Sequence, residues 1–261
     1  MESVLRISNL SKKYDRTEAI KGISLEVGAG EVFGFLGPNG AGKTTTMKCC
    51  AGLLRPTTGH ITVNGHDIVK QAAQAKAHIG FLPDSPYLYE KLTGREYALF
   101  LAGLYGVTGA VAEKRADDYF ELFDLTDWRD ELIQGYSRGM RQKTGIIAAL
   151  LHQPDLLLVD EPTASLDPKS SRLVKDIFGT MKKQGRTVFM STHVMEIAES
   201  LCDRIGIIHQ GELKALGTID ELRAPRHGET LEDIFLEVTG SHRPEVMENI
   251  EALSAKAETE A

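Results

Sequence analysis

One glycine-rich segment restricts the possible folds of this chain more than any other part of its sequence. Residues 37–44 read Gly-Pro-Asn-Gly-Ala-Gly-Lys-Thr, which matches the phosphate-binding loop pattern in full. The apolar run 32–36, typical of a buried strand, precedes the loop, and a helix-forming stretch follows it. Glycines let such a loop turn with positive φ and aim its N–H groups at phosphate oxygens, and the following helix adds the positive end of its dipole. The sequence therefore predicts an α/β fold that holds a nucleoside triphosphate.

The side chains of this loop have separate expected roles. Lys43 is expected to reach the β- and γ-phosphates as a catalytic residue, and the Thr44 hydroxyl is expected to bind Mg²⁺. We expect the nucleotide to be held by Gly37, Pro38, Asn39, Gly40, Ala41, Gly42, Lys43, Thr44 and Thr45. The alternative is a glycine-rich turn with a surface lysine, which the strand before the loop and the helix after it disfavour.

A pair of carboxylates provides a second chemical signal. The apolar strand 156–159 ends in Asp160 and Glu161, and in a parallel sheet the carboxyl ends of strands are where ligands bind. Asp160 can hold Mg²⁺ together with Thr44, whereas Glu161 can orient an attacking water or accept its proton. The alternative is an acidic strand cap before a turn, which a phosphate-binding loop in the same chain disfavours. His193 follows the next apolar strand, where a lone histidine is more often structural on chemistry alone.

Composition and patterning exclude several classes of protein. The 261 residues carry a net charge of −7, whereas a nonspecific nucleic-acid binder needs an excess of lysine and arginine. No apolar run approaches the ~18 residues that cross a bilayer, and the best, 145–151, stops short. The beginning of the chain lacks an export signal, so we expect it to stay in the cytosol. The cysteines have no metal-ligand spacing and are expected to behave as buried small hydrophobes at Cys49 and Cys50.

Strand and helix signals divide the chain into three regions. An antiparallel sheet is predicted from strand patterns at 4–8, 23–27 and 61–68, the last with an Asn-Gly hairpin signal. The section 85–153 has helical periodicity and interrupts the α/β order, so we expect an inserted helical subdomain. Alternation then returns with strands at 156–160, 187–191 and 205–209.

Capping residues predict several helix boundaries. Asp167 is placed as the N-cap of a helix with a proline at its first position, and Gly185 is placed to end that helix. The capping patterns at 218–221 and 230–233 begin two short helices. From about His242 the chain is acidic and contains many alanines, and we expect a frayed tail there.

The segment 136–142, Tyr-Ser-Arg-Gly-Met-Arg-Gln, resembles the signature sequence of ATP-binding cassette (ABC) ATPases. This element separates that family from other enzymes with a phosphate-binding loop. Five motifs follow the family's order across about residues 4 to 225: the loop, the signature, the carboxylate pair, Ser-Leu-Asp at 165–167 and His193. The resemblance therefore covers most of the chain.

The resemblance implies a fold and a domain organisation. We expect an α/β P-loop NTPase fold: an ABC nucleotide-binding domain with a RecA-like core, an antiparallel β-subdomain and an inserted helical subdomain. The ATPase domain would cover residues 1–225, with the helical subdomain at about 85–153. Residues 226–261 would form a short C-terminal helical extension and tail.

The resemblance also implies that the site is shared between two chains. In this family two nucleotide-binding domains close head to tail, and each offers its signature helix to the ATP on the other's phosphate-binding loop. Ser137, Gly139 and Asp167 would then contact ATP in trans, with a hydroxyl and a bare N–H at a positive helix end. His193 would be a catalytic residue beside the γ-phosphate. Tyr14 would stack on adenine, the alternative being an amphipathic strand-edge tyrosine.

Two parts of the chain depart from the family's pattern. The usual signature is Leu-Ser-Gly-Gly-Gln, and here Tyr136, Arg138 and Met140 replace its first, third and fifth residues. Arg138 would either add a cation near the trans phosphate or point to solvent. Asp84 stands where the family commonly has a glutamine that senses the metal and couples to the membrane partner. It would bind Mg²⁺ through water or contribute less.

The function implied is that of a transporter's ATP-binding subunit. We expect the chain to bind ATP and Mg²⁺ and to hydrolyse ATP to drive transport, with export favoured. The expected partners are a second nucleotide-binding domain, identical or related, and an integral membrane permease at the cytoplasmic face of the membrane, with no nucleic acid. Docking is expected through residues 84–95 and the first inserted helix. The alternatives are a soluble ABC-type ATPase that regulates translation or another process, and a small-molecule kinase, which leaves the signature unexplained.

Overall fold

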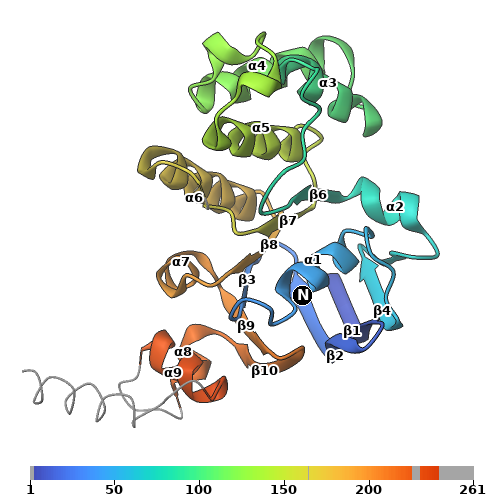
Figure 1. Cartoon of the computed structure of the whole chain (residues 1–261), viewed down its shortest axis with the longest axis vertical. Helices are drawn as coiled ribbons and strands as arrows, with labels where there is room; N and C mark the ends of the chain where they lie inside the picture. Colours follow the sequence, from blue (N-terminus) through green and yellow to red (C-terminus); the bar gives the residue numbers. More distant parts are fainter. Residues whose placement is uncertain (1–2, 164, 225–229, 241–261) are drawn as a thin grey trace, which may run out of the picture.

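The computed structural model of the chain describes residues 3–163, 165–224 and 230–240, which form two β-sheets and the helices around them (Figure 1). A group of helices lies at one end of the molecule, and the two sheets lie next to each other in the remainder. This arrangement confirms the predicted α/β fold with an antiparallel sheet and an inserted helical section. The predicted tail beyond His242 lies outside the described residues.

The smaller sheet is antiparallel and has the strand order β2-β1-β4-β5. Its strands are β1 Ser3–Tyr14, β2 Thr17–Gly28, β4 Thr58–Val63 and β5 His66–Asp67. Asn64 and Gly65 both have positive φ between β4 and β5, which is the geometry that Asn-Gly hairpins require. The predicted hairpin is therefore confirmed.

β1 and β2 are longer than the strands predicted at 4–8 and 23–27. They pair through several register shifts, one of which lies between Ile7 and Leu10. Asn9, within that interval, has a φ of 47°, a conformation that few residues other than glycine adopt. Such irregularities interrupt the alternation of apolar and polar residues, so the sequence pattern stops before the strand does.

The larger sheet has the strand order β10-β9-β3-β8-β7-β6. Neighbouring strands of this sheet pair in parallel, except β9 and β10, which pair antiparallel. The strands are β3 Val32–Leu36, β6 Ile79–Leu82, β7 Leu156–Asp160, β8 Thr187–Thr192, β9 Arg204–His209 and β10 Glu212–Gly217. The three central strands β3, β7 and β8 are buried throughout, which explains their continuous apolar character. β6 and β10 form the two edges of this sheet, and neither was among the strands predicted from the sequence.

The inserted helical section connects β6 to β7, as predicted. Its helices are α3 Gly94–Leu104, α4 Gly109–Leu122 and α5 Arg138–Leu150, with 3₁₀ turns at Thr126–Trp128 and Ile133–Gly135. Small buried residues line the inner faces of α3 and α4, where Ala98, Ala102 and Ala116 pack into the core. Small side chains let helix backbones approach closely, and this holds the section together.

The predicted capping residues are confirmed in the remaining helices. Asp167 accepts a hydrogen bond from the N–H of Ser170 at the beginning of α6 Pro168–Lys183, and Gly185 follows its end with a φ of 77°. Thr218 and Thr230 form capping boxes at the beginning of α8 Ile219–Arg223 and α9 Leu231–Val238. The other helices are α1 Lys43–Cys50, α2 Ala72–Ala77 and α7 Met195–Leu201.

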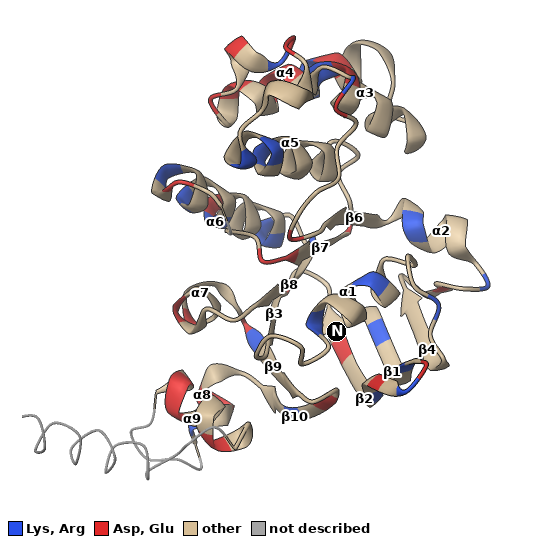
Figure 2. Ribbon diagram, in the orientation of Figure 1, with Lys and Arg blue, Asp and Glu red and all other residues tan. Residues whose placement is uncertain are grey.

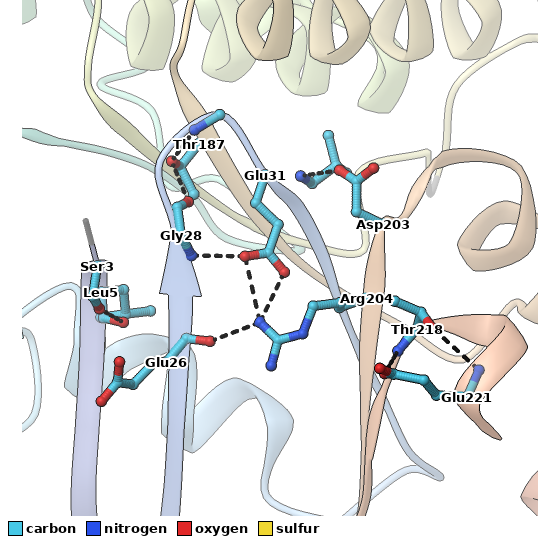
Figure 3. Close-up of polar contacts among 12 residues, drawn as sticks. Ser3, Leu5, Glu26, Gly28, Glu31, Thr187, Asp203, Arg204, Thr218 and Glu221 are labelled. Carbon is cyan, nitrogen blue, oxygen red and sulfur yellow. Dashed lines mark hydrogen bonds and ion pairs between the residues drawn. The ribbon is translucent and has the colours of Figure 1, made fainter. Parts of the chain in front are cut away.

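A polar network fastens the two sheets together at the amino ends of the central strands (Figure 3). The carboxylate of Glu31 accepts from the N–H of Gly28 at 2.6 Å and from the guanidinium of Arg204 at 3.2 Å. Arg204 also donates to the carbonyl of Glu26, on β2, and the Thr187 hydroxyl donates to the carbonyl of Gly28. These bonds connect β2 to the larger sheet at the amino ends of its strands. The carboxyl ends of the strands of the larger sheet are left free for a site.

Buried aromatic and sulfur-containing side chains fill the core between the smaller sheet, α1 and β3. Phe189 lies 5.4 Å and 5.5 Å, centroid to centroid, from Phe33 and Phe35. Cys49 and Cys50 are fully buried beside them, and burial raises the pKa of the Cys49 thiol to about 11. The prediction that this pair acts as buried hydrophobes is confirmed. Among the described residues, no helix combines the length and apolarity that crossing a membrane would need.

Candidate active site

The phosphate-binding loop follows β3, and its last two residues, Lys43 and Thr44, already form the beginning of α1. Gly42 is the N-cap of α1 and has a φ of 113°, and a Cβ there would lie 2.7 Å from the carbonyl oxygen of Ala19. A Cβ at Gly37 would lie 2.4 Å from the carbonyl oxygen of Ile208. The loop is therefore so closely packed against β2 and β9 that only glycine fits at these positions.

A pocket of about 240 Å³ opens over this loop. It brings together the loop, the carboxyl end of β7 and the segment after β6. The residues that line it are Ala19, Pro38, Asn39, Gly40, Gly42, Lys43, Thr44, Thr45, Asp84, Asp160 and Glu161. All of these except Ala19 were predicted as site residues, and no chemical signal in the sequence distinguishes that alanine.

Lys43 is the cation of the pocket, and its side chain is held inside the loop. It is 6% exposed, and its Nζ donates to the carbonyl oxygens of Gly37 at 2.6 Å and Pro38 at 3.3 Å. Burial lowers its pKa from the ordinary value, although the charges of Glu161 and Asp160 oppose the shift. A phosphate group here would supply the opposite charge that a buried ammonium group needs.

Asp160 is held by two hydroxyl groups. This carboxylate is 2% exposed, and its Oδ2 accepts a hydrogen bond of 2.7 Å from the Thr44 hydroxyl, while its Oδ1 accepts one from the Ser191 hydroxyl. The predicted pairing of Thr44 with Asp160 therefore exists in space. The contribution of Ser191 was not predicted, although its position at the end of β8 beside the end of β7 follows from parallel pairing.

The donor set at Thr44 and Asp160 fits a magnesium ion. A hydroxyl and a carboxylate are hard oxygen ligands, and Mg²⁺ in nucleotide sites is held by one or two protein oxygens plus phosphate and water. Within the described part of the chain, no group of three or more His, Cys, Asp or Glu side chains could hold a metal ion by itself. The ion would therefore complete its shell with phosphate and water oxygens.

Glu161 is held from three sides by the end of β8. Its N–H donates to the carbonyl of Ser191 at 3.0 Å, and its Oε2 accepts from the Thr192 hydroxyl at 3.2 Å. Nδ1 of His193 lies 2.7 Å from its Oε1. Glu161 also has a φ of 52°, and non-glycine residues persist in that conformation where surrounding contacts enforce it. The backbone strain and the three contacts together aim this carboxylate at the pocket.

The structure places the other predicted contacts outside the lining of this pocket. Tyr14 is the last residue of β1 and is 42% exposed, and the Nζ of Lys12 lies 5.1 Å from its ring centroid. Ser137 is the N-cap of α5, where its hydroxyl accepts from the N–H of Met140, and Gly139 lies in the first turn of that helix. The carboxylate of Asp167 is bound within its own chain by Ser170.

Known proteins share the sequence and the fold of this chain. The protein-family model described as ABC transporter matches residues 20–164. The linearmycin resistance ATP-binding protein LnrL of Bacillus subtilis (strain 168) is 42% identical over 91% of this chain and 76% of its own length. A solved structure described as the ATP-binding subunit of an ABC transporter covers 91% of this chain and 100% of its own, with a TM-score of 0.87 and 32% identity.

A second solved structure also shares the fold. It is a dimeric, post-hydrolysis form of the ATP-binding cassette MJ0796 bound to ADP and Pi, with a TM-score of 0.76 and 25% identity over 82% of this chain and 98% of its own. The family model covers more than half of the chain, and the relatives named here cover nearly all of it. The chain therefore belongs to the ABC transporter family of ATP-binding proteins.

Proposed function

We propose that two ATP-binding cassettes of this kind close over two ATP molecules, and that hydrolysis drives transport through a separate membrane-spanning partner. The chain is an ATPase subunit by family, and the proposal concerns how its residues do the work. The observation that carries it is the anchored pair Asp160 and Glu161 at the end of β7, facing the phosphate-binding loop across one pocket.

Each residue of the pocket has a defined task in phosphoryl transfer. Lys43 neutralises charge on the β- and γ-phosphates, and Thr44 with Asp160 would hold Mg²⁺, which supplies further charge neutralisation when bound. Glu161 orients the attacking water and accepts its proton, because its carboxylate is fixed and faces the pocket. His193 holds that carboxylate in place. The loop itself positions the nucleotide through its N–H groups.

We propose that the facing cassette completes the site. Ser137, Gly139 and Asp167 lie outside the lining of their own pocket, where they are free to approach the ATP held by a second chain. The dimeric form of the related cassette MJ0796 supports this arrangement. Tyr14, with its exposed ring, would stack on the adenine, and Asp84 would touch the metal through water. A homodimer and a pair with a related chain fit equally well.

We further propose that the membrane partner docks in a groove beside the helical section. This groove, of about 270 Å³, is lined by residues of α3 and α5, of the segments around β6 and of the segment after α1, including Leu53, Phe81, Pro86, Tyr97 and Tyr105. Tyr87 at its rim is 88% exposed. The segment 83–87 reaches both this groove and the nucleotide pocket, which Asp84 lines, so occupancy of one can affect the other. An apolar segment of the partner fits this surface.

The name of the relative LnrL, a resistance protein, favours export as the direction of transport. The subunit would then work at the cytoplasmic face of the cell membrane, attached through its partner. The domain division follows from the same reading, with residues 1–225 as the ATPase domain and 226–261 as an extension.

A soluble ABC-type regulator is the competing function. Purification in mild detergent separates the two, because a transporter subunit copurifies with an integral membrane protein.

The experiment that tests the catalytic proposal is Glu161→Gln. The amide keeps the size and one oxygen of the side chain but cannot accept a proton, so ATP binding should persist while turnover falls below about 1%. An ATP-bound dimer should accumulate, visible in analytical ultracentrifugation. Hydrolysis at the wild-type rate by the purified variant would remove Glu161 from this role.

A further inference from the structure

A partly buried lysine on α5 lies outside the nucleotide pocket and directly follows the signature segment. The side chain of Lys143 is 13% exposed, so protein atoms cover most of its surface. Its Nζ donates to the carbonyl of Phe123 at 3.2 Å and lies 3.5 Å from Oδ2 of Asp167. Removing an ammonium group from water is costly unless good partners compensate, so an apolar residue would be the simpler choice for packing alone.

The partners of Lys143 belong to two different elements. Phe123 is the C-cap of α4, and Asp167 is the N-cap of α6, so the lysine connects both of them to α5. On its other side, Asp167 accepts 2.9 Å and 2.6 Å hydrogen bonds from the N–H and the hydroxyl of Ser170. These bonds from Ser170, with a smaller contribution from Lys143, hold the pKa of Asp167 well below its usual range.

A second contact joins the same two elements. A Cβ built on Gly139 would lie 3.2 Å from the carbonyl oxygen of Ser165, so the first turn of α5 runs against the segment that leads into α6. Basic residues gather at the beginning of α5, the end of that helix nearest α6 (Figure 2). The first turn of the signature helix and the N-cap of α6 are thus already in place relative to each other within one chain.

We propose that Lys143 is a positioning residue, which locks the signature helix to the N-cap of α6 so that Ser137, Gly139 and Asp167 meet the facing ATP as one rigid unit. This inference rests on the proposed dimer. Without the lysine, α5 and α6 would have to be aligned during closure, and part of the binding free energy would be lost to that ordering.

The proposal differs from a merely structural role in a measurable way. Methionine has nearly the length and volume of the lysine stem, and Asp167 stays half exposed with both of its bonds from Ser170. Lys143→Met should therefore leave the free energy of unfolding close to the parent value. The nucleotide pocket of the same chain is untouched, so the ATP affinity of the monomer should also stay the same. Only the step that joins two chains should weaken.

The experiment uses the full chain with Glu161→Gln as parent, so that ATP traps the dimer. Lys143→Met should weaken ATP-dependent dimerisation about tenfold, within the range found for coupled pairs of residues. Lys143→Arg should restore it, because the guanidinium group can donate to both partners. The matched control is Lys169→Met, which removes a neighbouring ion pair with Asp124. That pair has an N–O distance of 2.5 Å, but both side chains are exposed, so it contributes little.

Dimerisation is measured by sedimentation across protein concentrations, ATP binding by a fluorescent ATP analogue, and stability by urea denaturation. Parent-like dimerisation of Lys143→Met would overturn the inference, and so would a loss of folding stability that accounts for the defect. If the parent itself stays monomeric with ATP, the proposed function fails, and this inference fails with it.

Discussion

The imidazole of His193 and the carboxylate of Glu161 face each other with 2.7 Å between Nδ1 and Oε1, across the ends of two neighbouring parallel strands. Glu161 directly follows β7, whereas its contacts come from Ser191 and Thr192 at the end of β8 and from His193, which follows that strand. The carboxylate proposed as the general base is therefore held by the neighbouring strand and the residue after it. A substitution at the end of β8 can misalign it without touching the nucleotide.

The first prediction follows from this contact. In His193→Ala the Glu161 side chain loses one of its anchors, so we expect kcat to fall about 10- to 100-fold, as misplacement of a general base does. The apparent affinity for ATP should change by less than about threefold, because the loop and Lys43 are unaffected. Steady-state ATPase assays measure both values. His60→Ala, which removes an exposed histidine of the smaller sheet, is the control. A wild-type kcat for His193→Ala would show that the contact is incidental.

The second prediction concerns Lys43. Burial of its ammonium group lowers the folding stability, and we expect this cation to be present because it binds phosphate. Lys43→Met should weaken ATP binding roughly 10- to 100-fold, since a charge-assisted hydrogen bond to phosphate is lost. The same change removes a buried cation, so the nucleotide-free protein should unfold no more easily than the wild type. Equilibrium binding and urea denaturation test the two halves. Lys114→Met, on the exposed face of α4, should alter neither.

The pH dependence of the free energy of unfolding provides a third test, of whether Lys43 is desolvated in the folded protein. Its pKa is lower in the folded protein than the 10.5 of an exposed lysine, so the unfolded chain binds more protons between the two values. The wild type should therefore gain stability relative to Lys43→Met as the pH rises through the folded pKa toward 10.5. Below that window the difference should be constant. A difference that is independent of pH throughout would mean that the lysine is not desolvated in solution.

Local signals were enough to predict the loop, β7 and the helix caps. The phosphate-binding loop depends on glycines at fixed positions, β7 on a continuous apolar run, and the caps at Asp167 and Thr218 on a side chain bonding within its own turn. All of these interactions lie within a few residues along the chain. Short stretches of sequence are therefore enough to predict these elements, and the structure confirms the predictions.

The features that the sequence did not predict depend on contacts between distant segments. Ser191 reaches Asp160 because β7 and β8 are neighbours, and Lys143 reaches Asp167 because α5 packs near α6. Neither residue lies in a motif that would distinguish it. Ala19 lines the pocket from β2, and an alanine carries no chemical signal that would distinguish it in the sequence. Pairing of strands and packing of helices supply this information, and a single sequence does not contain it in readable form.

The next prediction tests the proposed docking groove. Tyr87→Ser should detach the subunit from its membrane partner, because an exposed aromatic side chain at an interface typically contributes about 2 kcal/mol or more to binding. The ATPase activity of the isolated subunit should remain, since Tyr87 does not line the nucleotide pocket. Copurification from detergent extracts measures assembly. Trp128→Ser removes another exposed aromatic residue, 46% exposed and outside the lining of the groove, and should assemble normally. Full assembly of Tyr87→Ser would place docking elsewhere.

The last prediction concerns the packing under the phosphate-binding loop. Gly34 lies in the middle of β3, and a Cβ there would lie 2.7 Å from the Sγ of Cys202 and 3.2 Å from a methyl group of Leu36. Gly34→Ala should therefore lower the free energy of unfolding by about 1–3 kcal/mol, the usual cost of overpacking a core.

A second substitution shows whether the crowding against Cys202 is the cause. Cys202→Ala removes the Sγ, so the double variant should recover part of the stability that Gly34→Ala loses. Gly179→Ala is the matched control, because its added Cβ meets nothing within 4 Å inside α6. It should gain about 0.5–1 kcal/mol from the helix preference of alanine. Urea denaturation of the wild type and the four variants distinguishes these effects, and strictly additive losses in the double variant would contradict the proposed crowding.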